Sequence, residues 1–179
     1  MDEIEIVDYD PRWPRLFEEE RATLTRLLPA GQILAIEHAG STAVAGLAAK
    51  PIIDIYLAVA SIEHARPLLI EPIRAAGYAY WDENPDATRM FFVKGMPPYG
   101  ERRSHHIHVM EHDSEAWLRT LIFRDYLQQH ADEAHRYGGL KRALAARFRS
   151  DREAYTRAKD AHIDAAVAKA RAAAPASRR

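Results

Sequence analysis

The stretch Lys50-Pro51-Ile52-Ile53-Asp54-Ile55-Tyr56-Leu57-Ala58-Val59 decides the fold of this 179-residue chain. Lys50-Pro51 ends any preceding helix, and the residues from Ile52 to Val59 give the strongest strand signal in the sequence. A strand that is almost wholly apolar is typical of the interior of a sheet, where both faces are buried. We therefore expect a central strand over residues 52–59 that is interrupted by one acid.

That acid, Asp54, needs an explanation. An ionised carboxylate among apolar residues is costly unless a cation or hydrogen-bond donors compensate its charge. Because strand side chains alternate, Asp54 shares a face with Tyr56. Asp54 is either a catalytic, metal-binding acid or a structural acid paired with Lys50, Arg89 or a backbone donor. The apolar character of the strand favours the functional interpretation.

A segment rich in glycine and hydroxyl side chains precedes this strand: His38-Ala39-Gly40-Ser41-Thr42-Ala43-Val44-Ala45-Gly46-Leu47. It follows a short predicted strand over residues 33–37 and is typical of a turn that leads into a short helix. Backbone N–H groups and hydroxyls in such a turn can bind an anion. The candidate phosphate-binding residues are therefore Gly40, Ser41 and Thr42, and a simple turn is the alternative.

Two charged residues flank this segment. Lys50 can neutralise a phosphate as a point charge, or it can be an ordinary surface lysine. Glu37 stands where the preceding strand would open into a site, so it is a candidate metal ligand or the ion-pair partner of a neighbour.

A pair of histidines lies on another predicted strand, Ser104–Glu111. Alternation places His106 and His108 on one face, and it places Ile107 and Val109 on the opposite face, toward the core. Two imidazoles on a polar face can bind a metal, contact phosphate or transfer protons. We name both histidines as candidate catalytic residues and favour phosphate or substrate contact over metal binding.

The remaining sequence predicts a mixed α/β front half and a helical back half. Further strands are expected over residues 4–7, 78–81 and 89–94, and helices over about 11–28 and 62–76. Pro67 and Pro72 are expected to make the second of these helices irregular or to delay its start. The chain is expected to be helical after residue 112, and a capping box at Ser150-Asp151-Arg152-Glu153 predicts the start of the last helix.

The expected organisation is one domain over residues 1–171. It consists of an α/β core over about 1–112 and a helical region over 113–171, and a disordered tail is expected over 172–179. Three charged residues of the helical region are expected to be salt-bridged at the surface, unless this region covers the site: Arg124, Asp125 and Lys141.

Composition excludes several classes of function. The chain has no cysteine, which rules out disulfides, zinc–thiolate sites and thiol nucleophiles. Its 25 Lys+Arg balance 26 Asp+Glu, so nucleic acid is not an expected partner, although a local basic pocket for one nucleotide remains possible. Without a signal peptide at Met1–Glu5 or an apolar run of ~18 residues, we expect a cytoplasmic protein with no membrane partner.

The motifs together resemble those of a known family. The blocks Glu37–Val44, Gly46-Leu47 and Lys50–Ile55, followed by His105–Val109, look like the signature of the GrpB-like family. Parts of the helical region are similar to it too, so that the resemblance extends from Asp8 to about Val167.

The GrpB-like family is in turn similar to nucleotidyltransferases of the polymerase-β type. In that superfamily a Gly-Ser turn holds nucleotide phosphates, and a later strand carries two acids, spaced by one residue, that bind divalent metal. The resemblance implies a small mixed sheet flanked by helices, a nucleoside triphosphate as substrate and Mg²⁺ as cofactor. Gly40, Ser41 and Asp54 are the matching positions.

The sequence departs from that pattern at the second acid, which falls on Tyr56. A phenol does not replace a carboxylate as a ligand for Mg²⁺, and two-metal transfer needs several carboxylates on one face. Three hypotheses follow. The first is transfer of a nucleoside monophosphate to an unknown acceptor, with His106 or His108 assisting proton transfer. The second is a non-catalytic module that binds a nucleotide or a CoA-like ligand, and the third is a His-based metal-dependent phosphoesterase.

Overall fold

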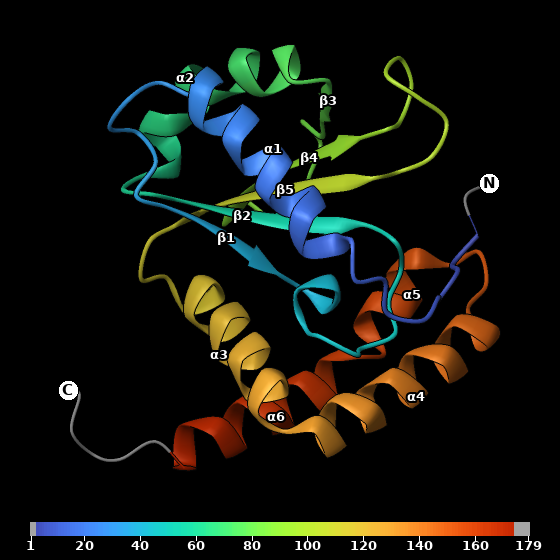
Figure 1. Cartoon of the computed structure of the whole chain (residues 1–179). Coiled ribbons are helices and arrows are strands. Elements are labelled where there is room, and N and C mark those ends of the chain that lie inside the picture. The colour runs from blue at the N-terminus through green and yellow to red at the C-terminus, as the bar shows by residue number, and fades with distance from the viewer. Residues whose placement is uncertain (1–2, 174–179) are drawn as a thin grey trace.

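A five-stranded mixed sheet carries the predicted central strand, as the computed structural model shows for residues 3–173 (Figure 1). Its strands are β1 (Ala35–Ala39), β2 (Ile53–Val59), β3 (Tyr78–Tyr80), β4 (Arg89–Lys94) and β5 (His105–Glu111). Their spatial order is β1-β2-β5-β4-β3, with β2 parallel to β5 and all other neighbours antiparallel. The mixed α/β fold expected from the sequence is thus confirmed, and β2 lies inside the sheet.

One face of the sheet is covered by α1 (Trp13–Leu27) and α2 (Ile62–Ala75), which lie above the strands in Figure 1. Alternate residues of β2 point into this layer, so that Ile55 and Leu57 are fully buried together with Leu24 of α1. Full burial of such an aliphatic side chain stabilises the fold by about 1.5–3 kcal/mol. This layer is therefore the main hydrophobic core.

The start of the chain differs from the prediction. α1 begins at Trp13 rather than at Pro11, because the Asp10 carboxylate accepts the backbone N–H of Arg12 and closes a turn first. The segment 4–7 forms no strand. Val7 makes an isolated bridge with Ala49, whereas Ile4 donates to the carbonyl of Arg149, so its ends contact two different parts of the molecule.

The helix α2 matches its predicted limits. Ser61 caps it by accepting the N–H of His64, and Gly77 follows its end with a φ of 87°. Pro67 and Pro72 lie inside the helix, so its start is not delayed.

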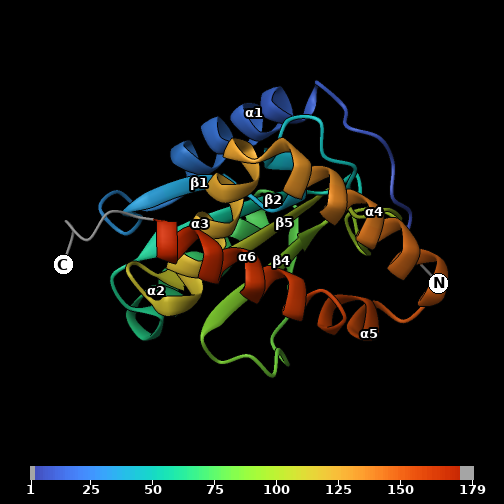
Figure 2. The same cartoon turned by 90° about the horizontal axis from the view of Figure 1, so that it is seen from below.

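The opposite face of the sheet is covered by the helical region. It contains α3 (Glu115–Gln129), α4 (Ala131–Arg147), α5 (Arg152–Arg157) and α6 (Asp160–Ala173), and Figure 2 shows these helices from below, in front of the strands. Helices from the last third of the chain therefore lie over the face that carries Asp54.

Three predictions for this region are wrong. Asp151, not Ser150, caps α5, because the Asp151 carboxylate accepts the N–H of Ala154 at 2.9 Å. The expected last helix is also divided into α5 and α6 by a turn at residues 158–159. Residues 172–173 belong to α6 rather than to a tail, and 174–179 lie outside the described residues.

None of the helices within residues 3–173 is both long and apolar enough to cross a lipid bilayer.

Candidate functional site

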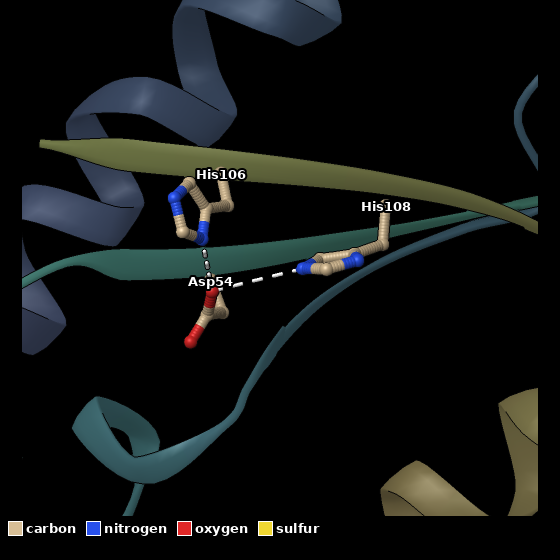
Figure 3. A group of neighbouring side chains, drawn as sticks. All are labelled: Asp54, His106 and His108. Atoms are coloured by element: carbon tan, nitrogen blue, oxygen red, sulfur yellow. Dashed lines mark hydrogen bonds and ion pairs between the residues drawn. The ribbon is translucent and has the colours of Figure 1, made fainter. Parts of the chain in front are cut away.

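The parallel pairing of β2 with β5 brings the candidate residues together. Asp54 is opposite His106 in the register, and Tyr56 is opposite His108. Since residues opposite each other in neighbouring strands point to the same face, all four side chains face the helical region. Figure 3 shows both imidazoles directed at the Asp54 carboxylate.

Two contacts define this group. The Nδ1 atom of His106 lies 3.1 Å from Oδ1 of Asp54, and Nε2 of His108 lies 3.7 Å from the same oxygen. His108 is also stacked on Tyr56, with ring centroids 4.4 Å apart. Tyr56, found where a second acid was expected, therefore supports a histidine.

Arg89 on β4 selects the tautomer of His108. Its Nη1 atom lies 3.2 Å from Nδ1 of His108. A guanidinium can only donate, so Nδ1 accepts and the imidazole proton is on Nε2, which faces Asp54. The carboxylate therefore accepts a hydrogen bond from His106, and the N–H of His108 faces it from 3.7 Å.

These contacts set the charge of the group. Burial alone would raise the pKa of the Asp54 carboxyl, but the hydrogen bond from His106 and the nearby His108 outweigh it and hold the pKa well below its usual range. Burial lowers the pKa of His108 to about 4, even though Asp54 acts to raise it. Near neutral pH, the site thus contains a negative Asp54 beside a neutral His108.

The same three side chains have donor atoms suited to a metal ion. Within residues 3–173, Asp54, His106 and His108 offer ligand atoms that all lie within 4.8 Å of one another. Two donors that share a metal at about 2.1 Å are separated by roughly 3.0–3.4 Å, close to the 3.1 and 3.7 Å found here. The spacing fits a divalent cation, although a cation would have to displace the N–H protons that now point at Asp54.

The carboxylate points toward the Gly-Ser bend. Gly40 has a φ of 70° and a ψ of −171°. A Cβ atom at this position would lie only 2.5 Å from Oδ2 of Asp54. Ser41–Ala43 continues as the predicted short helix, a single 3₁₀ turn.

A cavity of about 730 Å³ contains this group and the bend. Gly40, Ser41, Thr42, Lys50 and Asp54 line it together with both histidines. Thr42 is buried, and its hydroxyl donates to the Ile52 carbonyl and lies 3.0 Å from Nε2 of His38, so this hydroxyl stabilises the loop. Glu37 shares the face of Tyr56, but its carboxylate pairs with Arg124 at 2.7 Å rather than joining the Asp54 group.

The lining of the cavity is strongly cationic. Among the described residues that line it, only three are carboxylates: Asp54, Asp86 and Glu153. Nine are lysine or arginine: Lys50, Arg89, Arg103, Arg119, Arg124, Lys141, Arg152, Arg157 and Lys159. A cavity with this charge excess attracts anions, although the chain as a whole is nearly neutral.

The helical region therefore contributes to the site, which is the alternative that the sequence left open for Arg124 and Lys141. Arg124 reaches from α3 to the carboxylate of Glu37 and the carbonyl of His38. Lys141 is only 1% exposed and donates to the carbonyl of Ala48. The spacing of lysines along a helix is the same whether they face solvent or a polar cavity. The sequence alone therefore could not distinguish a surface lysine from a lysine that lines the cavity.

Aromatic side chains form another part of the lining. Trp81 and Phe91 are in edge contact, with ring centroids 6.0 Å apart, and Trp81 is 43% exposed. Tyr155 on α5 is buried and lies between lysines. Sequence reasoning missed Trp81, Phe91, Tyr155 and Lys159 as site residues. The one available signal was an aromatic pair, Tyr80-Trp81, at the end of a short strand.

Comparison with known proteins identifies the family. The family model described as GrpB protein matches residues 3–169. The chain belongs to the GrpB family. This GrpB-family chain is 36% identical to the conserved protein GrpB of Enterococcus faecalis, whose crystal structure superimposes with a TM-score of 0.80 and covers 93% of this chain and 96% of that one.

Relatives occur in several bacteria. A UPF0157 protein of Pseudomonas aeruginosa is 49% identical over 96% of this GrpB-family chain and 69% of its own length. The UPF0157 protein YqkA of Bacillus subtilis is 40% identical over 91% of this chain but only 46% of its own length. The glutamate-rich protein GrpB of Alkalihalophilus pseudofirmus is 31% identical over 90% of this chain and 92% of its own.

Proposed function

We propose that this GrpB-family protein is a nucleotidyltransferase, which binds a nucleoside triphosphate in the cationic cavity and transfers its nucleoside monophosphate to an acceptor hydroxyl. One observation carries the proposal: the Asp54 group, the Gly-Ser bend and the excess of cations line a single cavity. The resemblance to the polymerase-β superfamily assigns the same roles to Gly40, Ser41 and Asp54.

The residues of the chain supply binding and charge in this reaction. The acceptor hydroxyl loses its proton to solvent, and its oxygen forms a bond to the α-phosphorus. The bond from that phosphorus to the oxygen bridging to the β-phosphate breaks, so diphosphate leaves with additional negative charge. Lysine and arginine side chains of the cavity offset that charge. His106 and His108 orient the Asp54 carboxylate, because both direct a ring nitrogen at its Oδ1.

A divalent cation at Asp54 would neutralise phosphate oxygens. Mg²⁺ prefers oxygen ligands, whereas one carboxylate with two imidazoles suits Zn²⁺ or Mn²⁺ better. Arg89 would have to release His108 for the imidazole to ligate a metal, and its contact with Asp86 at 3.1 Å gives it an alternative partner.

The direct test is calorimetry with ATP, GTP, CTP and UTP, each with Mg²⁺, Mn²⁺ or Zn²⁺ and with no metal. We expect at least one triphosphate to bind, to bind more tightly with a divalent ion, and to release diphosphate in ³¹P NMR when an acceptor is supplied. The matching nucleosides, which lack phosphates, serve as controls and should bind weakly. Failure of all four triphosphates to bind would reject the proposal.

A second candidate is a non-catalytic module that binds a nucleotide or a CoA-like ligand. The observation that favours it is the arrangement around Asp54. Its carboxylate already accepts a hydrogen bond from His106, and the N–H of His108, whose tautomer Arg89 fixes, faces it from 3.7 Å. Metal-independent binding without turnover would select this candidate. Release of inorganic phosphate alone would instead select the phosphoesterase.

The exposed aromatic wall predicts how the base is held. We expect Trp81→Ala to weaken nucleoside triphosphate binding by roughly 5–150-fold, because stacking of one base on an aromatic ring is worth about 1–3 kcal/mol. Binding of inorganic triphosphate should not change. Calorimetry with both ligands measures the difference, and Tyr99→Ala, an equally exposed aromatic outside the cavity lining, is the control. Equal losses for both ligands would exclude a stacking role.

A further inference from the structure

Three lysines from separate parts of the sequence gather at one part of the cavity. Lys50 precedes β2, Lys141 lies on α4, and Lys159 lies in the turn between α5 and α6. The Nζ atoms of Lys50 and Lys159 approach the same ring, that of Tyr155, at 5.5 and 4.5 Å from its centroid. Tyr155 is 1% exposed, so the ring is a fixed support for both ammonium groups.

The partners of two of these lysines, Lys141 and Lys159, differ from those of several arginines in the same lining. Arg119 pairs with Asp164 at 2.7 Å, Arg124 with Glu37 at 2.7 Å, and Arg157 with Glu153 at 3.2 Å. Lys141 instead donates to a backbone carbonyl and lies 4.8 Å from the Tyr137 ring, and Lys159 lies over Tyr155. These contacts are with uncharged groups, so they leave positive charge for a ligand.

Burial and mutual repulsion both lower the pKa values of two of these lysines. Burial lowers the pKa of Lys141 to about 7, and Lys159, Lys50 and Arg142 lower it further, while Asp54 opposes them. Burial lowers the pKa of Lys159 to about 8, with Lys50 acting in the same direction and Asp54 and Asp160 against it. Burial is therefore the main cause of both lowered pKa values, and repulsion among the lysines adds to it.

We propose that Lys50, Lys141 and Lys159 form an anion site for the distal phosphates of a polyphosphate chain. This inference deepens the proposed function, since it assigns the part of a triphosphate that lies beyond the Asp54 group to the helical region. A nucleotide and inorganic triphosphate share this chemistry. The site is therefore expected to accept inorganic triphosphate without nucleoside and without metal.

Lys159→Gln is the substitution that tests the site. Lys159 is half-buried, and glutamine keeps much of its apolar stem against Tyr155. Lys141 is less suitable, because its ammonium group also supports the loop at Ala48. Lys169→Gln removes a lysine from the same C-terminal segment, one that pairs with Glu133 outside the cavity lining, and is the matched control.

The measurement is calorimetry with sodium triphosphate at low ionic strength in the presence of EDTA, after circular dichroism has shown that each variant is folded. We expect wild type and Lys169→Gln to bind alike and Lys159→Gln to bind at least about tenfold more weakly, since a charge-assisted contact is lost. At pH 8 wild type should take up protons on binding, as seen in buffers of different ionisation enthalpy, because an anion raises the pKa of both depressed lysines. Lys159→Gln should take up fewer.

Unchanged affinity in Lys159→Gln, or an equal loss in Lys169→Gln, would overturn the proposal. Failure of wild type to bind triphosphate would overturn it as well. If triphosphate binds at this site but no nucleotide is turned over, the anion site stands and the proposed transfer fails. If nucleotide is turned over but triphosphate binding does not depend on Lys159, the proposed transfer stands and the anion site fails.

Discussion

Asp54→Asn is expected to leave the protein folded but to abolish the effect of divalent metal on nucleotide binding. Asparagine keeps the shape and one oxygen of the side chain, yet it removes the charge that a cation would need. The loss of metal affinity should exceed the roughly 10–100-fold that is typical when a hydrogen-bond partner of a metal ligand is removed. Calorimetry of Mn²⁺ and Zn²⁺, alone and with a triphosphate, measures this effect.

The same substitution has a pH-dependent effect on stability. The pKa of Asp54 is lowered in the folded protein, so its carboxylate contributes stability above the ordinary carboxyl pKa of about 3.9 and loses that contribution as the pH falls toward the lowered value. We expect urea unfolding at pH 7 to show Asp54→Asn as less stable by about 1.5–3 kcal/mol, the worth of hydrogen bonds to a charged group. The difference should shrink below about pH 4.

Asp8→Asn is the control for both measurements, because the Asp8 side chain is exposed and pairs with Arg142 away from the cavity lining. It should behave like wild type. Metal-dependent nucleotide binding that persists undiminished in Asp54→Asn would show that this carboxylate holds no cation.

Gly40→Ala is expected to damage both the fold and the site. Its φ of 70° and ψ of −171° fall in a region that only glycine adopts readily, which costs another residue roughly 1–3 kcal/mol. The added Cβ would also lie 2.5 Å from Oδ2 and 3.0 Å from Cβ of Asp54, and overpacking of this kind costs about 1–3 kcal/mol. We expect a total loss of about 3 kcal/mol, or a Tm lower by roughly 6–12 °C.

Because Asp54 must move to admit the methyl group, Gly40→Ala should also lose the hydrogen bond from His106 and with it nucleotide binding. Gly46→Ala separates the effect of backbone strain from the effect of a steric clash with Asp54. Gly46 has a φ of 78°, but nothing lies within 4 Å of a Cβ placed there, so this variant should lose only about 1–2 kcal/mol and bind ligand normally. Equal destabilisation in the two variants by thermal melting would show that the contact with Asp54 is unimportant.

Local features of the fold could be predicted because they depend on local pattern. The apolar run around Asp54 indicated an interior strand, and alternation correctly placed His106 and His108 on one face. The register that sets Asp54 opposite His106 is different, since it pairs residues that are far apart in the chain. Nothing in either strand alone specifies that partner. The sequence therefore predicted the members of the Asp54 group but not their contact.

The errors at helix ends and in the helical region have equally physical origins. Ser150 and Asp151 are both good N-cap residues. Tertiary packing selects Asp151, and this packing cannot be recognised from the neighbouring sequence. Lys141 lies in a polar helical stretch and Lys159 in the turn after α5, and both stretches fit a solvated surface equally well. Their position against the cavity depends on how α4–α6 cross the sheet, and this follows from packing across the whole domain.

The order of the chain has a consequence for synthesis. The sheet is complete at Glu111, whereas Lys141, Tyr155 and Lys159 are translated later. During synthesis the N-terminal part of a chain leaves the ribosome first, although a domain generally folds as a unit. A nascent chain that ends at Glu111 contains Asp54 and both histidines but lacks Lys141 and Lys159. The proposed anion site is therefore complete only after the final helices have left the exit tunnel.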